Sequence, residues 1–490
     1  MDDDKNDEDI FTKEIIDTSR EPSIEVSTPK KGLILILIAI VLILVGVAVI
    51  LYFIFKTHVD EQNYIIAKYM IKDINSHNII FNEAFLNYIK KIKVNDNEIT
   101  KNNNITFTKE GKNEVEIQFS ENLKKLDNLF FQVDTLEEVD LSYLTSDDII
   151  STSDMFNGCK NLENIIFGDF ETKNLINISN MFSGCEKLPS IDIGIFKNEN
   201  MKDINGLFFN CSGLKKINIG EFNTRNVVNM SKLFSGCNLL SEINLHHATN
   251  FQTSNVKDMS FMFQNCRSLE NLNLNQFDVS QVIYMDNMFE SCEKLKNLEI
   301  EFFNTKNAES MMFMFSNCQN LNSLNLSSFD TSKVTLMFGM FNDCRNLNDL
   351  QVNSFDTSFV KDMGEMFRNC ESLINIDILN FDVRNVTNMF KMFDNCRQLK
   401  SLNISNFETE NLENATHFLN DCQNLTSLDI RKFNSMKLDN DTDFFGESSQ
   451  KATIIYNRKI FYLTTIPSSW EKKDISGNSN LIEQKLFFQK

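Results

Sequence analysis

Residues 318–344 read CQNLNSLNLSSFDTSKVTLMFGMFNDC, and this stretch recurs along most of the 490-residue chain. The cysteines measure the recurrence, because nine of the ten intervals between them are 26 residues and the other, from Cys237 to Cys266, is 29. A fixed period of this length indicates a solenoid, in which each repeat packs against its neighbours. All eleven cysteines lie on the grid: Cys159, Cys185, Cys211, Cys237, Cys266, Cys292, Cys318, Cys344, Cys370, Cys396 and Cys422.

Two spacings inside one repeat predict its shape. Counted from the cysteine as position 0, aliphatic residues at +6 and +8 lie two apart, which places both on one face of a short strand. Apolar residues at +16, +19, +22, +23 and +26 form the stripe of a helix of about three turns. Between them stands a motif such as Phe329-Asp330-Thr331, whose short oxygen-bearing side chains suit a helix N-cap. We therefore predict a strand, a corner and a helix in each repeat.

The repeat resembles the BspA-like family of leucine-rich-repeat surface proteins. The resemblance covers roughly residues 120–448 and implies an α/β leucine-rich-repeat solenoid, with the strands on its concave side and the helices on its convex side. Where many such repeats carry a ladder of Asn, this chain repeats Phe at +11, so we expect aromatic packing rather than amide hydrogen bonds at the corner. The matching positions in one repeat are Leu321, Leu324, Leu326, Phe329, Val334, Met337, Met340, Phe341 and Cys344.

The repeats, twelve units in residues 133–448, are flanked by segments of other composition. Residues 103–132 and 449–490 are expected to be the N-terminal and C-terminal caps, because a solenoid must cover its two apolar ends. Residues 1–32 are predicted to be a disordered acidic tail, and residues 57–102 a membrane-proximal stalk.

Residues 33–55 are 23 consecutive residues without a charge, enough to cross a bilayer of about 30 Å at about 1.5 Å per residue. A cleavable signal peptide is the alternative, but the run is too long for one and a polar segment precedes it. We therefore predict an N-terminal transmembrane helix and a single-pass membrane protein. Lys30 and Lys31 beside the span favour a cytoplasmic N-terminus (type II), and the resemblance likewise implies that the repeats are extracellular.

The cysteines allow three interpretations: a disulfide ladder, a string of metal sites, or buried thiols. Neighbouring helices pack about 8–10 Å apart, whereas a disulfide needs Cα atoms within about 7 Å. No cysteine has the CxxC neighbour typical of a zinc site. We therefore expect buried thiols, no metal and no cofactor. The pair His246-His247 stands in the one longer repeat, where we expect a solvated loop.

Position +7 of the repeat is an acid or an amide in nearly every unit. It lies between two buried aliphatic residues, so its side chain should face solvent on the concave side. A broad polar surface of this kind suits a protein or glycan partner, and the alternative is that these are ordinary solvated strand residues. The candidate binding residues are Asp192, Asn218, Asn244, Asn273, Glu299, Asn325, Gln351, Asp377, Asn403 and Asp429.

The net charge of −20 disfavours nucleic acid as a partner, because a nucleic-acid-binding fold needs a basic surface. The sequence has no nucleophile elbow, phosphate-binding loop, dinucleotide fingerprint or HExxH motif, so we expect no catalysis. The prediction is a membrane-anchored recognition or adhesion protein. The alternative is a structural surface-coat protein or an intracellular membrane scaffold.

Overall fold

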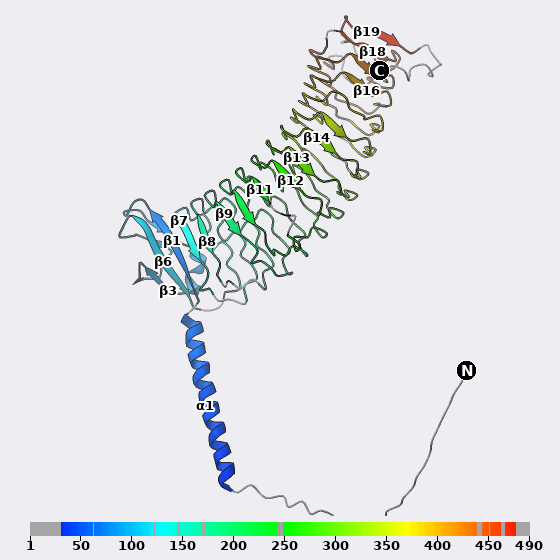
Figure 1. Cartoon of the computed structure of the whole chain (residues 1–490). Coiled ribbons are helices and arrows are strands. Elements are labelled where there is room, and N and C mark those ends of the chain that lie inside the picture. The colour runs from blue at the N-terminus through cyan, green and yellow to red at the C-terminus, as the bar shows by residue number, and fades with distance from the viewer. Residues whose placement is uncertain are drawn as a thin grey trace, which may run out of the picture. The chain divides into compact units, whose positions relative to one another are not determined.

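The structure is a computed structural model that describes residues 31–61, 63–120, 123–144, 148–168, 170, 173–243, 245, 248–438, 443–449, 451–461 and 466–476. The chain divides into two compact units, residues 1–61 and residues 62–490 (Figure 1). The predicted acidic tail, residues 1–32, lies outside the described residues except for its last two.

The described part of the first unit is one helix, α1 (Lys31–Glu61), which contains the uncharged run 33–55. Its side chains are described at residue 36 and at residues 38–52, and all of them are exposed. Leu42, for example, is 65% exposed. Among the described residues, no helix combines the length and the apolar character that crossing a membrane requires.

The second unit begins with a sheet where a stalk was expected over residues 57–102. The order of its strands is β4-β3-β6-β1-β7-β8. The prediction of a stalk is therefore wrong, and the reason lies in β1, where every second side chain from Ile65 to Ile71 is at most 1% exposed. The elements here are β1 (Tyr64–Ile71), β2 (Asn78–Ile79), the 3-10 helix η1 (Glu83–Tyr88), β3 (Ile89–Val94), β4 (Asn97–Ile99), β5 (Asn104–Ile105), β6 (Gly111–Phe119), β7 (Leu136–Asp140) and β8 (Asn164–Ile166).

Strand β1 connects this sheet to the first coil of the solenoid. It pairs antiparallel with β7, placing Ala67 opposite Val139, and β7 then pairs parallel with β8, placing Val139 opposite Ile165. The antiparallel strands thus cover the first apolar coil with paired backbone, as the end of a repeat stack requires.

Most of the following coils contribute a short strand to one side of the solenoid, as Figure 1 shows for the labelled strands. These strands pair in parallel and in register, with Ile217 opposite Ile191 and Leu298 opposite Leu272. The predicted strand of each repeat is therefore confirmed in most coils. The strands are β9 (Ser190–Asp192), β10 (Lys216–Asn218), β11 (Glu242–Ile243), β12 (Asn271–Asn273), β13 (Asn297–Glu299), β14 (Ser323–Asn325), β15 (Asp349–Gln351), β16 (Ser401–Asn403) and β17 (Ser427–Asp429).

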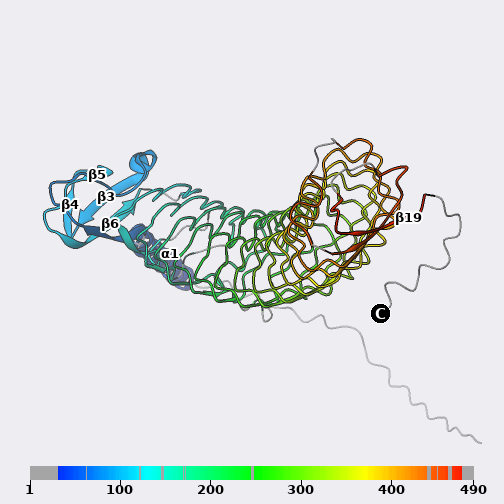
Figure 2. The ribbon, with the colours of Figure 1, turned by 90° about the horizontal axis from the view of Figure 1, so that it is seen from above.

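A second, narrower ladder runs along the coils away from these strands. It consists of isolated parallel bridges, one per coil, that continue unbroken through twelve coils. Figure 2 shows the stacked coils from above. The bridged residues are Lys125, Ser151, Asn177, Asp203, Asn229, Asp258, Tyr284, Ser310, Leu336, Asp362, Asn388 and Asn414. Each coil is thus bonded to its neighbours along two lines.

The helix predicted in each repeat is absent from the described coils, where consecutive turns take its place. The amide of Met288 donates to the carbonyl of Met285 at 3.3 Å, a bond between residues three apart and not four. The amide of Phe289 donates instead to the carbonyl of Met314 in the next coil, at 2.9 Å. Alternate amides therefore bond within the coil and between coils. The spacing of 3, 3, 1 and 3 residues, attributed to a helix, is equally the spacing of such turns.

Left-handed backbone positions explain why a helix does not form. The residue just before each cysteine has a positive φ, from +78° at Gly158 to +56° at Asp421, and so does the residue four places earlier. Left-handed residues interrupt an α-helix. The residues before the cysteines are Gly, Asn, Asp or Ser throughout, which are the types that adopt this conformation most readily or occur commonly in turns.

The core is a set of columns that run through the stack. Phe289 and Phe315 stack with ring centroids 5.6 Å apart and planes at 8°, and the same relation links most coils from Phe130 to Phe393. All eleven cysteines are free and completely buried beside this column. The expectation that the thiols pack as small core residues is confirmed.

The corner of each coil combines the expected aromatic packing with hydrogen bonds that were not expected. Phe303 and Phe329 stack at 6.1 Å, but Asn307 Nδ2 also donates to the carbonyl of Ser280 in the preceding coil at 2.8 Å. The prediction that amide hydrogen bonds play no part in the corner is therefore wrong. Asp330, predicted to be a helix N-cap, accepts the amide of Ser332 at 3.0 Å in a turn.

The C-terminal end continues the parallel ladder with β18 (Thr453–Tyr456) and β19 (Glu471–Asp474). Trp470 is 4% exposed, and its Nε1 donates to the carbonyl of Ser449 at 2.7 Å. Charged residues in β19, at the outer edge of this sheet, discourage pairing with another chain.

Candidate interaction surface on the strand side

Eight of the ten sequence-predicted binding residues lie at the last position of a short strand, whereas Asp377 lies in a coil without an assigned strand and Asn244 lies outside the described residues. In β10 the middle residue, Ile217, is 5% exposed, whereas Lys216 and Asn218 on either side face solvent. This alternation follows from the pleat of a strand, and it repeats from coil to coil because the strands pair in register. We call the side chains at +5 and +7 of the coils that carry β8 to β17 the strand face.

The ten candidates are not equally accessible on the strand face. Asn273 and Asn403 are half-buried, Asp429 is fully buried, and Asn244 lies outside the described residues. The exposed candidates are Asp192, Asn218, Glu299, Asn325, Gln351 and Asp377. The face predicted from the sequence is thus open at six of the ten positions.

Several candidates already have a structural role, which the sequence analysis missed. Asp192 Oδ1 accepts the amide of Gly194 at 2.8 Å, and Asn325 Oδ1 accepts the amide of Ser327 at 3.0 Å. Asn273 and Asn403 each bind the amide two residues on in the same way. These Asx turns end the strand and redirect the chain. One oxygen of each side chain is therefore engaged within the fold.

Asp429 is an ion-pair residue within the fold rather than part of an open surface. Its carboxylate is paired with the guanidinium of Arg431, which covers it. The hydrogen bond to Asp429 raises the pKa of Arg431. A buried charge is tolerated only when it is paired. A ligand that bound Asp429 would have to break its ion pair with Arg431 and would leave the fold with an unpaired charge.

A hollow of about 590 Å³ lies over the strand face of the N-terminal coils. Among its lining residues, Asn218 Nδ2 donates to Asp192 Oδ2 at 2.8 Å, which links two candidates across neighbouring coils. Lys216 and Glu242 also line it, and neither side chain has an ion pair or a side-chain hydrogen bond to any described residue. The hollow thus presents one free cation and one free carboxylate beside an amide. It can hydrogen-bond and pair charges with a partner.

The cysteines are chemically quiet in this fold. Burial raises the pKa of every one of the eleven thiols, in the case of Cys211 to about 12, so the reactive thiolate is scarce at neutral pH. Within the described part of the chain, no three His, Cys, Asp or Glu side chains are grouped so as to hold a metal ion. His246 and His247 lie outside it.

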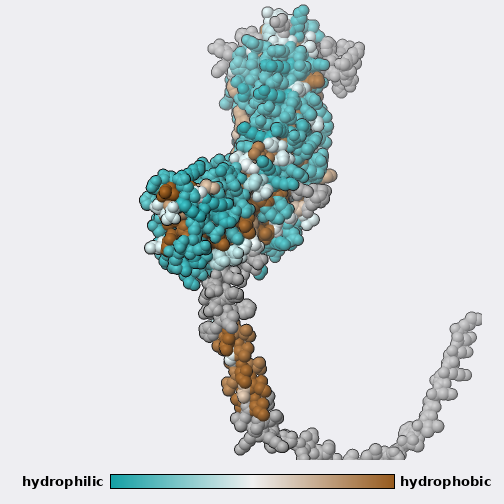
Figure 3. Space-filling model, turned by 60° about the vertical axis from the view of Figure 1, so that its left-hand side comes forward, coloured by the Kyte–Doolittle hydropathy of each residue, from teal (hydrophilic) through white to brown (hydrophobic). Residues whose placement is uncertain are grey.

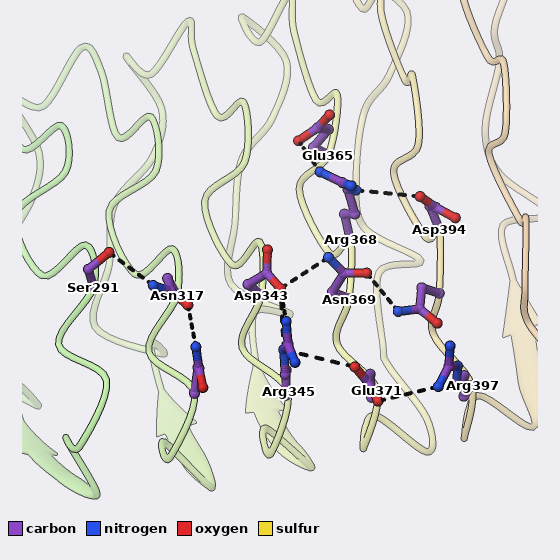
Figure 4. A network of polar contacts seen from close by, with 12 residues as sticks. Ser291, Asn317, Asp343, Arg345, Glu365, Arg368, Asn369, Glu371, Asp394 and Arg397 are labelled. Carbon is purple, nitrogen blue, oxygen red and sulfur yellow. Dashed lines mark hydrogen bonds and ion pairs between the residues drawn. The ribbon is translucent and has the colours of Figure 1, made fainter.

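A second polar array, drawn in Figure 4, follows the residues at and around the cysteine positions of later coils. Asn369 Nδ2 donates to Asp343 Oδ1 at 3.1 Å, and Asn395 Nδ2 donates to Asn369 Oδ1 at 2.7 Å. Glu371 lies 3.9 Å from Arg345 and from Arg397, on the coils to either side. Exposed ion pairs are worth about 0–1 kcal/mol each, so this array serves mainly to keep neighbouring coils in register. The Asn or Asp that recurs before the cysteines is the sequence pattern that could have predicted this array.

Stacked coils with short parallel strands and an LxxLxL core define a leucine-rich-repeat solenoid. The family described as "Mycoplasma protein of unknown function, DUF285" matches residues 124–246, 238–351 and 337–457, and the family described as "BspA type Leucine rich repeat region (6 copies)" matches residues 63–172. The chain belongs to the DUF285 family and to the BspA-like leucine-rich-repeat proteins.

Solved structures show likeness to the chain at low identity. A leucine-rich repeat protein from Bacteroides ovatus is 16% identical with a TM-score of 0.40, over 75% of this chain and 90% of that one. A leucine rich cell surface protein from Faecalibacterium prausnitzii is 17% identical with a TM-score of 0.34, over 64% of this chain and 89% of that one. No curated protein matches the chain.

Proposed function

We propose that this is a membrane-anchored, non-catalytic recognition or adhesion protein whose strand face binds a protein or a glycan. The observation that carries the proposal is the hollow over the N-terminal strands, where Lys216 and Glu242 have no side-chain partner among the described residues. Charged groups without an ion pair in the fold can pair with a partner without breaking one.

The composition of the strand face favours weak contacts repeated over several coils. It carries mostly amides, acids and serines, together with Lys216 and Ile166, and lacks the Trp and Tyr that dominate tight interfaces. Several weak sites on one rigid array reach useful affinity when they bind a partner that repeats along its length. A polymer or a partner displayed in many copies on a surface meets this condition.

The membrane anchor in the proposal is α1, because residues 33–55 are long enough and apolar enough in sequence to span a bilayer. Carbonate extraction of membranes tests the anchor: the full chain should stay in the pellet and residues 62–490 should not associate with it. Protease access to a C-terminal tag on intact cells tests the orientation, and the tag should be cleaved. A protected tag would replace the extracellular recognition protein by an intracellular scaffold.

Binding by the strand face is tested with glycan and protein arrays probed by residues 62–490. Every described core residue lies between Ile65 and Trp470, so this fragment keeps the whole core. The double variant Lys216→Glu/Glu242→Lys inverts the charges of the hollow and leaves the net charge unchanged. It should lose the ligands that the unaltered fragment binds.

Asp349→Lys is the matched control, because Asp349 occupies the same strand position in a distant coil, outside the hollow. If neither array shows binding, or if the charge swap leaves every ligand bound, the strand face is not the recognition surface. Concentration-dependent self-association in sedimentation, unaffected by the swap, would favour the structural alternative.

A further inference from the structure

An elongated groove of about 930 Å³ follows the narrow ladder of the N-terminal coils, apart from the strand face. Its floor is formed by the residues nine places before each cysteine or its equivalent, one per coil. They are Lys124, Ile150, Ile176, Lys202, Val228 and Lys257. Three lysines and three aliphatic residues are therefore interspersed along the groove.

The aliphatic members of this row are unusually exposed for their type. Ile150 is 36% exposed, Ile176 is 39% exposed and Val228 is 43% exposed. The residues just before them in the chain, such as Ile149 and Leu175, are at most 1% exposed and fill the core. The exposed row is thus not needed to complete the core, and apolar side chains gathered in a groove indicate a binding surface.

The lysines of the row are free. Among the described residues, Lys124, Lys202 and Lys257 have no ion pair and no side-chain hydrogen bond. Of the two acids in the groove lining, Glu199 lies 4.0 Å from Arg225, which is outside the lining, and Asp148 has no ion pair with any described residue. The described lining therefore carries three lysines against two acids, on a chain whose net charge is −20. Charge complementarity calls for an acidic ligand.

The backbone of the row is hydrogen-bonded from coil to coil. The amide of Ile176 donates to the carbonyl of Ile150 at 2.9 Å, and the amide of Lys202 donates to the carbonyl of Ile176 at 2.9 Å. The groove wall is held by Asn226, whose Nδ2 donates to the carbonyl of Glu199 at 2.8 Å. A ligand must therefore be read by side chains at fixed spacing, and it cannot add as a strand to the ladder.

The length of the groove fits an extended peptide. Five steps of about 4.8 Å between six coils give a span of about 24 Å, which is about seven residues of extended chain. Lys124 and Lys202 stand three coils apart, about 14 Å, and Lys202 and Lys257 stand two coils apart, about 10 Å. Side chains on one face of an extended chain are an even number of residues apart, about 7 Å for two residues and about 14 Å for four. Acids four and then two residues apart therefore match the three lysines, and the long lysine side chains span the remaining gap.

We propose that this groove binds an extended acidic peptide of a protein partner. Its carboxylates, spaced four and two residues apart and therefore on one face of the extended chain, pair with Lys124, Lys202 and Lys257. The aliphatic residue midway between the first two carboxylates lies on the same face and packs on Ile150 and Ile176. The surface lies apart from the strand face, so the solenoid can hold this peptide and a second ligand at the same time.

The test is an array of octapeptides of one composition that differ in the spacing of three glutamates, probed with residues 62–490. ETITEVEV, with acids at the first, fifth and seventh positions and an isoleucine at the third on the same face, should bind best, and EEEITVTV should bind about tenfold more weakly. The triple variant Lys124→Gln/Lys202→Gln/Lys257→Gln should lose about tenfold in affinity for ETITEVEV. Exposed substitutions of this kind leave the fold intact. Lys361→Gln is the control, because Lys361 is the same row position in a distant coil.

Two further arms distinguish the class of ligand. Vesicles of phosphatidylserine and phosphatidylcholine test a lipid surface, and heparin tests an anionic polysaccharide. The proposal is overturned if ETITEVEV binds no more tightly than EEEITVTV, or if the triple variant binds ETITEVEV as tightly as the unaltered fragment does. It is equally overturned if vesicles or heparin bind through these lysines more tightly than every peptide.

Discussion

The thiol of Cys318 donates a hydrogen bond to the carbonyl oxygen of Phe289 in the preceding coil, with 3.1 Å between Sγ and O. The same bond occurs at every cysteine. In the first repeat Cys159 donates to the carbonyl of Phe130 at 2.9 Å, and in the last Cys422 donates to the carbonyl of Phe393 at 3.1 Å. Each thiol is thus both a core residue and a link between two coils. This explains why a residue prone to oxidation can stand at the centre of the repeat: its position is buried and its proton is engaged.

Removing one such thiol should cost a measurable part of the stability. Cys344→Ala deletes the bond to the carbonyl of Phe315 and leaves a small cavity, so we expect a loss of about 1–2 kcal/mol in the free energy of unfolding. Urea titration followed by circular dichroism measures it. Lys361→Ala, an exposed change in a neighbouring coil, should stay within about 0.5 kcal/mol, and equal losses for both would contradict the role of the thiol.

The thiols should be inaccessible to reagents until the solenoid opens. Because all eleven are buried and free, a thiol reagent such as Ellman's should label almost none in the native protein and all eleven in denaturant. Time-resolved absorbance gives the number labelled. Rapid labelling of several thiols under native conditions would show that the coils open readily.

Alkaline pH should destabilise the fold through the same thiols. Burial raises the pKa of Cys292 and Cys344 to about 12, above the value near 8.5 expected when unfolded. The folded state therefore binds these protons more tightly, and their contribution to stability is complete below about pH 8.5 and is lost as the pH rises toward 12. The melting temperature should fall from pH 8 upward through about pH 11. The variant Cys292→Ala/Cys344→Ala should show a shallower fall, and an equally steep one would assign the effect to other groups.

The left-handed position before each cysteine should tolerate some residue types better than others. Gly184 has φ +69°, and a Cβ built there would come no closer than 3.4 Å to Gly158, so space is available and only the backbone conformation opposes a side chain. Gly184→Ala should cost about 1 kcal/mol, and Gly184→Asn should cost less, because Asn adopts this conformation more readily. Thermal unfolding of the two variants gives the order. Equal stability of the alanine variant and the natural protein would show that the turn is not strained.

The buried threonine at the corner should act through its hydroxyl. Thr331 is 1% exposed, and its Oγ1 donates to the carbonyl of Asp356 in the next coil at 2.8 Å. Thr331→Val keeps the shape and removes the donor, so we expect a loss of about 1 kcal/mol, whereas Thr331→Ser should keep most of that bond. A valine variant as stable as the natural protein would assign Thr331 to packing alone.

The sequence by itself determined the repeat, its strand and its core. Leu324 is buried and Asn325 exposed because the period of two follows from the pleat, and Phe289 and Cys292 are buried because their columns recur in every coil. The polar candidates at +7 were placed correctly at Asp192 and Gln351 for the same reason. Asp429 was predicted to be exposed but is buried, because Arg431 covers its carboxylate. The repeat spacing does not reveal this ion pair.

Only the tertiary structure decided the second half of each coil. The apolar spacing from Val282 to Cys292 fits a helix and a run of turns equally well, because both bring residues three or four apart to one side. Hydrogen bonds between coils decide in favour of turns. The amide of Phe289, for example, donates to the carbonyl of Met314 in the next coil and not to a carbonyl within its own coil, as it would in a helix. The tertiary structure also decided which lysines are free. Lys296 pairs with Glu270 at 3.0 Å, whereas Lys202 has no ion pair among the described residues. Pairing across coils depends on the register of the whole stack, and the local sequence does not contain it.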